Sequence, residues 1–481
     1  MKGLVLLENA DRVLHYFEEI SRIPRSSGDE RAISEYLAVF AKEHGFEYVQ
    51  DDRDNVIIKK PASVRNCRCE PVIIQGHTDM VYVRGEGCKR AYEDGIGLIY
   101  RDGWLSADGT TLGADNGIAV AFALALLDSE DIPHPDIEAV FTASEEIGML
   151  GAENLDCSNL RGKYLINLDT EIEGVFFTSC AGAFRNELRL PAERETLNGL
   201  NSLKIRISGL RGGHSGMEIH EGRANAIQLM ARILDKLEGK VHLSSLEAEG
   251  KTNAISNNAA AEIFADEKAL DAAIKTIKEM ERKFQTEYCG RDDVAIALIR
   301  GEKKSASCYT ESSQRKIVAA LLLIPCGVLG MSFNMPGLVE SSSNPGYIEE
   351  KEDGISVFSL SRSAIGSRKA EIRARLCAIA ELCGGESICT SDYPQWEFRQ
   401  DSPLRALAMR TYEEMFGTEA RTCAIHAGLE CGYFNEYLNG VDIISYGPDL
   451  EGVHTPKERA NLDSIERVWQ LTQAILEKLA R

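Results

Sequence analysis

The chain has 481 residues, of which 75 are acidic and 54 basic, so its formal net charge is −21. Hydrophobic residues make up 44% and charged residues 27%, a balance that excludes a wholly disordered chain and suggests roughly two to four domains. A surface this negative repels phosphate backbones and anionic lipids, so we expect no nucleic-acid partner and no membrane partner.

The cysteines and the N-terminus indicate the compartment. The 13 cysteines are scattered and form no paired C-x-x-C sites, which is typical of reduced thiols. The first residues, MKGLVLLENADR, have only a short apolar run followed by acids, so no signal peptide is expected. These features predict a cytoplasmic protein.

The first 180 residues alternate between helical and strand patterns. Apolar residues recur at helical spacing over residues 10–23 and 30–44, and residues 117–127 are apolar on all sides, as in a helix buried against a sheet. The alternation predicts an α/β fold, a doubly wound mixed sheet covered on both faces. Its buried strands are expected at residues 55–58, 71–74, 138–142 and 164–168.

A different pattern occupies residues 183–390. It predicts an α+β block, with helices on one side of a mostly antiparallel sheet. The serine-rich stretch 340–346 is predicted to be a loop. Helices are expected at residues 222–238, 266–285, 311–325 and 364–383, and strands at 203–208, 259–264 and 355–360.

The first pattern returns after about residue 391, with helices predicted at 402–415 and 461–480 and a strand at 441–445. We therefore expect one discontinuous catalytic domain, residues 1–182 with 391–481. Residues 183–390 would form an inserted lid domain.

Several polar side chains follow predicted strands or lie in glycine-rich turns. In an open α/β sheet, ligands bind beyond the carboxyl ends of the strands. Each side chain alone has an ordinary explanation, such as a structural histidine or an acid at a helix N-terminus. Together they have the mixed nitrogen and oxygen composition that zinc accepts. The candidates are His77, Asp79, Asp115, Glu145, Glu146, Asp169 and His454.

Six motifs, in this order, resemble those of the aminoacylase and carboxypeptidase-G-type metallopeptidases. They are GHTDM at 76–80, LGADNGI at 112–118, ASEEIGMLGA at 143–152, NLD at 167–169, GGHSG at 212–216 and GVHTP at 452–456. Within that group, the segments IHAGLECGYF at 425–434 and SYGPDLEGVHTP at 445–456 resemble the bacterial aminoacyl-histidine dipeptidases. The resemblance runs nearly from end to end and is least distinct between residues 240 and 340.

The resemblance implies a site for two Zn²⁺ ions per chain, whose ligands manganese or cobalt would also tolerate. His77 and Asp169 would bind one ion, and Glu146 and His454 the other. Asp115 would bridge both ions.

Three further features of the site follow from the resemblance. The peptide bond between Asp115 and Asn116 would be cis. Asp79 would orient His77. Glu145 would be the general base, acting on a hydroxide that bridges the metals.

The inserted block contributes a second group of candidates. The resemblance makes His214, in the glycine-rich stretch 211–216, a histidine that hydrogen-bonds the transition-state oxyanion, and makes Asn253 a substrate contact. Arg362 matches an arginine that binds the substrate carboxylate, a pairing that suits guanidinium chemistry. On sequence alone, His214 is equally an incidental residue of a flexible turn, and Arg362 a solvated surface arginine. Glu430 is a candidate for the substrate amine.

These assignments predict a metal-dependent hydrolase of unblocked dipeptides, favouring Xaa-His peptides such as β-alanyl-histidine. The partners would be small peptide substrates, and the sequence leaves open whether the chain forms a homodimer. Two alternatives remain on the same fold. One is an N-acyl amino acid deacylase or an aminopeptidase for longer peptides, and the other is a catalytically inactive binding homologue.

Overall fold

The computed structural model describes residues 10–65 and 67–481, and these divide into two compact units. Unit 1 comprises the described residues up to Ser179, Trp396–Ala424 and Leu429–Arg481. Unit 2 comprises Cys180–Gln395 and the short segment Ile425–Gly428. The alternation of sequence patterns did not predict that Ile425–Gly428 belongs to unit 2.

Unit 1 is built on an eight-stranded mixed sheet, with the strand order β1-β2-β6-β3-β7-β20-β8-β19. The central strands β6, β3, β7 and β20 are parallel, and the strands flanking them are antiparallel. The strands are β1 (Glu47–Gln50), β2 (Val56–Lys60), β3 (Val72–His77), β6 (Ile137–Thr142), β7 (Tyr164–Asn167), β8 (Val175–Cys180), β19 (Arg421–Ile425) and β20 (Asp442–Ser445).

The central strands are covered on both faces. Every residue of β3, β6 and β20 is buried, as expected for parallel strands between layers of helices. One large core joins one face of the sheet to α1, α2, α3, α9 and α11, and α3 is apolar on all sides because it lies within this core. The helices of unit 1 are α1 (Asp11–Ser21), α2 (Arg31–Glu43), α3 (Ala114–Asp128), α4 (Leu150–Asn154), α9 (Pro403–Phe416), α10 (Cys431–Tyr437) and α11 (Leu462–Ala480).

A small four-stranded sheet adjoins the main core. Its order is β21-β22-β5-β4, and it joins the N-terminal part of the chain to the segment just before α11. The strands are β4 (Leu98–Arg101), β5 (Trp104–Ala107), β21 (Leu450–Glu451) and β22 (Arg459–Asn461).

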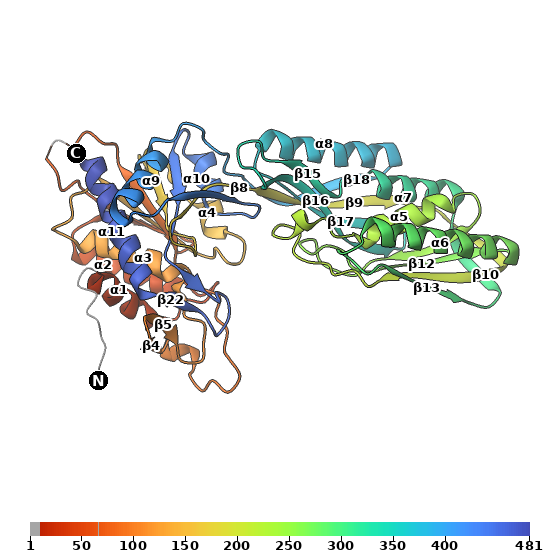
Figure 1. Ribbon diagram of the computed structural model, residues 1–481, viewed down its shortest axis with the longest axis horizontal. Helices are drawn as coiled ribbons and strands as arrows, with labels where there is room; N and C mark the ends of the chain where they lie inside the picture. Colours follow the sequence, from red (N-terminus) through yellow and green to blue (C-terminus); the bar gives the residue numbers. More distant parts are fainter. Residues whose placement is uncertain (1–9, 66) are drawn as a thin grey trace. The chain divides into compact units, whose positions relative to one another are not determined.

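Unit 2 contains two antiparallel sheets with the helices packed along them (Figure 1). The first sheet has the order β11-β12-β10-β13, with β14 also paired to β10, and the second has the order β15-β16-β17-β9-β18. The strands of the first are β10 (Arg194–Ser208), β11 (His242–Glu247), β12 (Ala259–Ala265), β13 (Ala295–Arg300) and β14 (Lys304–Tyr309), and those of the second β9 (Gly182–Pro191), β15 (Gly327–Met331), β16 (Val339–Lys351), β17 (Gly354–Ser363) and β18 (Glu386–Tyr393).

The helices of unit 2 bury apolar faces against these sheets in one continuous core. Helix α5 packs on β10 and β12, α6 on β10 and β13, and α8 on β9, β17 and β18. The helices are α5 (Ala226–Lys236), α6 (Glu267–Glu287), α7 (Glu311–Leu323) and α8 (Gly366–Cys383). The predicted fold class, an α/β sheet with an α+β block, is therefore confirmed.

The prediction of a loop at residues 340–346 is wrong, because these residues lie within the long strand β16. Their polar side chains are buried and bonded rather than solvated. Ser343 contacts Ser361, and Asn344 donates to the carbonyl groups of Thr252 and Ala254. The loop was predicted from the high serine content. In this chain the serines belong to a strand whose polar side chains are buried.

Candidate functional site

The carboxyl ends of the parallel strands β6, β3, β7 and β20 meet at one edge of the main sheet of unit 1. His77 is the last residue of β3, and Asp169 lies just beyond the end of β7. Glu145 and Glu146 follow β6, and His454 lies in the segment after β20. The topology thus brings side chains from distant parts of the sequence to a common edge.

Asp115 lies between two histidines. Its Oδ1 is 3.3 Å from Nε2 of His77, and its Oδ2 is 3.2 Å from Nε2 of His454. His77 Nε2 is also 3.8 Å from Oδ1 of Asp169, and His454 Nε2 is 2.7 Å from Oε1 of Glu146. The two oxygens of one carboxylate therefore face two separate groups of side chains.

Two of the close groups of metal-binding side chains share Asp115. One group is His77, Asp115 and Asp169, and the other is Asp115, Glu146 and His454. Within each group the ligand atoms lie within 4.8 Å of one another. The peptide bond from Asp115 to Asn116 is cis. All five residues that the resemblance implies as metal ligands are brought together.

The electrostatics of this cluster fit bound cations. Burial, together with neighbouring acids, raises the pKa of Asp169 well above its usual range. Hydrogen bonds to Asp115 and Glu146 raise the pKa of His454 to about 10. In both cases the carboxylates outnumber the positive groups beside them, so protons are retained on the cluster. Metal ions would supply this charge, and the nitrogen and oxygen donors suit zinc.

Asp79 has a wider positioning role than orienting His77. Its Oδ1 is 3.3 Å from Nδ1 of His77. It also accepts hydrogen bonds from the backbone N–H groups of Glu145 and Glu146 and from the hydroxyl of Ser27. Burial opposes ionisation of Asp79, but the bonds from His77 and the others lower its pKa to about 2. One buried carboxylate thus fixes both His77 and the loop after β6.

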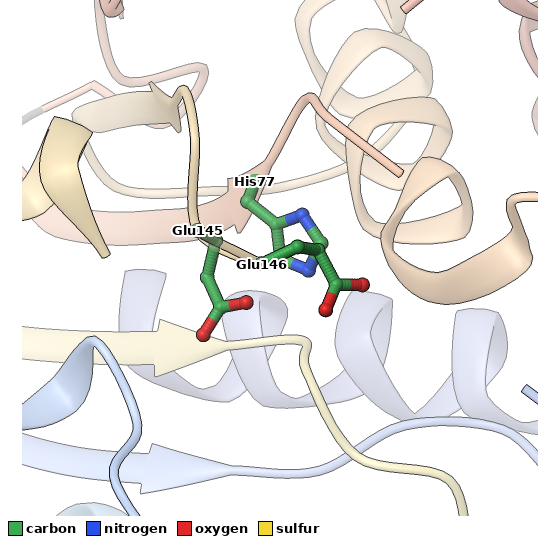
Figure 2. Close-up of side chains that lie close together, drawn as sticks. All are labelled: His77, Glu145 and Glu146. Atoms are coloured by element: carbon green, nitrogen blue, oxygen red, sulfur yellow. The ribbon is translucent and has the colours of Figure 1, made fainter. Parts of the chain in front are cut away.

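The side chains of His77, Glu145 and Glu146 lie close together, and the carboxyl groups of the two glutamates point in different directions (Figure 2). Burial raises the pKa of Glu145 to about 8, with Glu430 and Glu146 adding to the effect. Only Glu146 contacts His454 directly. The two adjacent acids therefore occupy different environments.

Two further residues, Glu458 and Arg25, were not identified from the sequence. Both form hydrogen bonds with the backbone segment that carries Asp115. The buried carboxylate of Glu458 accepts hydrogen bonds from four successive backbone N–H groups, those of residues 112–115 at the start of α3. The fully buried Arg25 donates to the carbonyl groups of Gly113, Thr78 and, at 3.4 Å, Asp79. These bonds link the segments that carry Asp115 and His77.

Glu430 lies fully buried in unit 1. Its Oε2 accepts hydrogen bonds from Gln75 at 2.6 Å and Thr142 at 2.7 Å, while its Oε1 has no partner among the described residues. Burial raises the pKa of Glu430 to about 7. The unpaired oxygen is the part of this side chain that is available for another contact.

His214 lies in unit 2 with a defined tautomer. Its Nδ1 accepts hydrogen bonds from the backbone N–H groups of Gly216 and Met217, so the proton of the neutral ring is on Nε2. Burial and the charge of Arg362 lower the pKa of His214. His214 is therefore a neutral imidazole that presents an N–H donor.

Arg362 and Asn253 also lie in unit 2. Arg362 lies near the end of β17, and only 5% of its surface is exposed. It is therefore not a solvated surface arginine. It donates through Nη1 to the hydroxyl of Tyr393. Asn253 is exposed, and its backbone carbonyl accepts a bond from Ser215, next to His214. Tyr393 had no signal in the sequence.

Comparison with known proteins identifies relatives across nearly the whole chain. The model of peptidase family M20/M25/M40 matches residues 73–478. The cytosol non-specific dipeptidase of Escherichia coli is 32% identical over 467 residues, which cover 96% of each chain.

Solved structures give the same result. The aminoacylhistidine dipeptidase of Vibrio alginolyticus matches with a TM-score of 0.91 and 33% identity, over 97% of this chain and 96% of that one. The aminopeptidase PepT of Bacillus cereus matches with a TM-score of 0.56 and 18% identity, over 98% and 99% of the two chains, which shows likeness of fold alone.

Proposed function

The chain belongs to peptidase family M20/M25/M40, and from this premise we propose that it is a dinuclear zinc dipeptidase that hydrolyses unblocked dipeptides. The observation that carries the proposal is the position of Asp115, whose two carboxylate oxygens face His77 and His454 separately. A shared ligand between two groups of donors is the arrangement that a two-metal site requires. The names of the relatives from Escherichia coli and Vibrio alginolyticus support the dipeptide substrate.

The proposed ligands are those implied by the sequence. His77 and Asp169 would hold one ion, Glu146 and His454 would hold the other, and Asp115, which belongs to both groups of side chains, would contribute to each. When bound, the ions would polarise the scissile carbonyl and make a water molecule more acidic.

Within the described residues, no helix has the length and apolar character needed to cross a membrane.

Glu145 is the proposed general base. It lies beside His77 but makes no contact with His454, so its carboxylate is free to accept a proton from the attacking water. The same group then delivers that proton to the leaving amine. Asp79 holds the backbone of Glu145 in place through the N–H of that residue.

His214 is the proposed donor to the oxyanion. Two backbone N–H groups occupy its Nδ1, so Nε2–H is the side that a substrate would meet. A neutral imidazole stabilises developing negative charge by donating a hydrogen bond without transferring its proton.

The substrate ends have separate proposed partners. Arg362 binds the free carboxylate, Glu430 the free ammonium group, and Asn253 makes a further contact. Pairing both ends selects dipeptides, because a longer or blocked peptide leaves a buried charge without a partner. A preference for C-terminal histidine is proposed from the resemblance and from the relative named an aminoacylhistidine dipeptidase.

The location and assembly are also proposals. The name of the Escherichia coli relative supports a cytoplasmic location, in agreement with the scattered cysteines. The substrate partners are small peptides. Sedimentation of the purified protein tests whether the chain forms a homodimer.

The substrate class is tested with four peptides under one set of conditions. We expect the zinc-loaded protein to cleave Ala-His and Ala-Ala, with Ala-His faster, and to show little activity on acetyl-Ala-His or Ala-His amide. The reason is the loss of one paired end in each blocked peptide. Release of free amino acids, measured by amine derivatisation, gives kcat/KM for each substrate.

Each contrary result has its own meaning. Equal rates on blocked and free peptides would contradict recognition of both ends. Equal rates on Ala-Ala and Ala-His would remove the histidine preference alone. Preference for acetyl-Ala-His would favour a deacylase, preference for longer peptides would favour an aminopeptidase, and no turnover of any peptide by metal-loaded protein would favour an inactive binding homologue.

The role of His214 is tested by His214→Ala. We expect kcat for Ala-His to fall by about 10² or more with KM little changed, because an oxyanion contact is made in the transition state. The metal content should remain that of the wild type, since His214 lies outside the groups of metal-binding side chains. His220→Ala, at an exposed position in the same unit, is the control. An increase in KM alone would make His214 a ground-state contact.

A further inference from the structure

A row of buried polar side chains crosses four adjacent strands of the main sheet in unit 1. His77 on β3 is paired with Thr142 on β6, and Gln75, two residues before His77, is paired with Asn167 on β7. Asn167 is paired in turn with Ser445 on β20. Paired residues, and residues two apart on one strand, project from the same face of a sheet. The polar row therefore lies on the face that carries His77, and it consists of Thr142, Gln75, Asn167 and Ser445.

Hydrogen bonds connect the polar row to Glu430. Ser445 donates to Oδ1 of Asn167, and Nδ2 of Asn167 donates to Oε1 of Gln75 at 2.6 Å. Nε2 of Gln75 then donates to Oε2 of Glu430 at 2.6 Å. The hydroxyl of Thr142 donates to the same oxygen at 2.7 Å. The row thus forms a chain of donors that ends at one carboxylate oxygen, and each bond in such a chain polarises the next.

The other oxygen of Glu430 has no such partner. Glu430 directly precedes α10 and is fully buried. Its Oε1 accepts no hydrogen bond in the part of the chain that the structure describes. A buried acceptor without a partner costs free energy, so the native protein usually supplies a partner for it. Since the polar row already holds Oε2, Oε1 is the oxygen that meets a ligand.

The charges near Glu430 favour a cation as the missing partner. Burial raises the pKa of Glu430, the charge of His77 opposes this effect, and Asp169 and Asp79 add to it. A carboxylate buried among other acids is stabilised by a positive charge at hydrogen-bond distance. An ammonium group supplies both the charge and an N–H donor.

Glu430 also lies near the proposed general base. Of the acids that act electrostatically on Glu145, Glu430 has the largest effect, ahead of the adjacent Glu146. In a dipeptide the ammonium nitrogen is two bonds from the scissile carbonyl carbon, a distance of about 2.5 Å. An ammonium group bound to Glu430 would therefore keep the scissile bond close to Glu145.

We propose that the polar row holds Glu430 in the orientation in which Oε1 binds the ammonium group of the substrate. Thr142, Gln75, Asn167 and Ser445 are then positioning residues that determine the requirement for a free N-terminus. The inference rests on the proposed function, which pairs Glu430 with that ammonium group. It adds that the selectivity depends on side chains of four strands that act through Glu430.

The polar row is tested with two substrates that differ in the ammonium group alone. N-propionyl-histidine keeps the carbon atoms of Ala-His and has a hydrogen atom in place of the ammonium group. In each metal-loaded variant, the ratio of kcat/KM for Ala-His to that for propionyl-histidine is measured. This ratio is insensitive to the fraction of active protein, because that fraction affects both substrates equally. For wild type we expect a ratio of roughly 10² or more, the effect of one buried charge pair.

Thr142 offers a matched pair of variants. Thr142→Val removes the hydroxyl with little change of shape, and it should lower the ratio roughly five- to tenfold by raising KM for Ala-His, the effect of one hydrogen bond. Thr142→Ser keeps the hydroxyl and should stay within about twofold of wild type. Thr178→Val is the control, because it removes a buried hydroxyl of β8 that bonds to the carbonyl of Cys423, outside the polar row. Its ratio should equal that of wild type.

Asn167→Leu tests action at a distance along the row. Asn167 is linked to Glu430 through Gln75, and its loss leaves Oε1 of Gln75 without that donor. The amide of Gln75 is then free to turn away from Glu430, so we expect the ratio to fall roughly threefold or more. Elemental analysis should show the metal content of wild type. An unchanged ratio in both Asn167→Leu and Thr142→Val would overturn the positioning role.

A binding measurement separates this inference from the proposed function. Isothermal titration of the metal-loaded, full-length protein with L-alaninamide and propionamide compares the same two N-terminal groups without a dipeptide bond. We expect tighter binding of alaninamide in wild type and a smaller difference in Thr142→Val. Equal binding of the two amides by wild type would overturn the inference. Absence of peptide hydrolysis, with the binding difference present in wild type and reduced in Thr142→Val, would overturn the proposed peptidase activity alone.

Discussion

The Asp115→Ala protein is expected to have no measurable peptidase activity and to lose bound metal. Asp115 is the one residue shared by the two groups of donors that contain Asp169 and His454, and its oxygens face both histidines. Its removal takes a ligand from each ion at once. The remaining acids and histidines would also lose the carboxylate that lies between them.

Metal content and activity are measured together in this experiment. Elemental analysis after exhaustive dialysis should give close to two metal ions per chain for wild type, as the proposed site requires, and a clear deficit for Asp115→Ala. The exposed Asp52 offers a matched control, since Asp52→Ala removes an acid of the same unit outside the cluster. Two retained ions with normal turnover in Asp115→Ala would show that the bridging assignment is wrong.

The sequence predicted the positions of the main strands and helices of unit 1 well, because hydrophobic periodicity is a property of short segments of the chain. Hydrophobic periodicity located β3, β6, β7 and α3 to within a few residues. Polar residues directly after such strands were expected at one edge of the sheet, and the structure places His77 and Asp169 there. Their chemical roles depend on bound metal and stay predictions.

Glu458 and Arg25, which fix the backbone around Asp115, could not be predicted from hydrophobic periodicity. Glu458 acts through backbone N–H groups more than 340 residues away in sequence, and Arg25 acts through backbone carbonyls. Neither interaction leaves a periodic or compositional pattern. Such contacts depend on tertiary structure, which brings a side chain to a backbone segment whose own sequence carries no complementary signal.

At strand β16 of unit 2 the sequence carried a clear signal, but it led to a wrong prediction of a loop. Serine and asparagine usually mark loops because their side chains compete with the backbone for hydrogen bonds. In β16 these side chains bond instead to neighbouring strands and to His426, as Ser342 does. The serine-rich stretch at residues 340–346 is therefore a buried polar part of a strand paired with the strand of Arg362, and not a turn.

The Glu145→Gln protein is expected to keep its metal but to lose a factor of roughly 10² to 10⁴ in kcat, the contribution of a general base. Glutamine has nearly the shape of glutamate and cannot accept the proton of the attacking water. Without metal, burial and neighbouring acids raise the pKa of Glu145 to about 8. Bound cations would lower this pKa, which keeps the carboxylate ionised and basic near neutral pH.

The pH dependence makes this prediction specific. A base must be deprotonated, so wild-type kcat should rise as pH increases through the pKa of Glu145 in the metal-loaded enzyme and then level off. In Glu145→Gln the part of that acidic limb that comes from Glu145 should disappear, because the glutamine amide does not titrate. The exposed Glu130 provides the control Glu130→Gln, which should retain wild-type kcat and the acidic limb. A Glu145→Gln protein within a few-fold of wild type, with the limb still present, would assign the proton transfer to another residue.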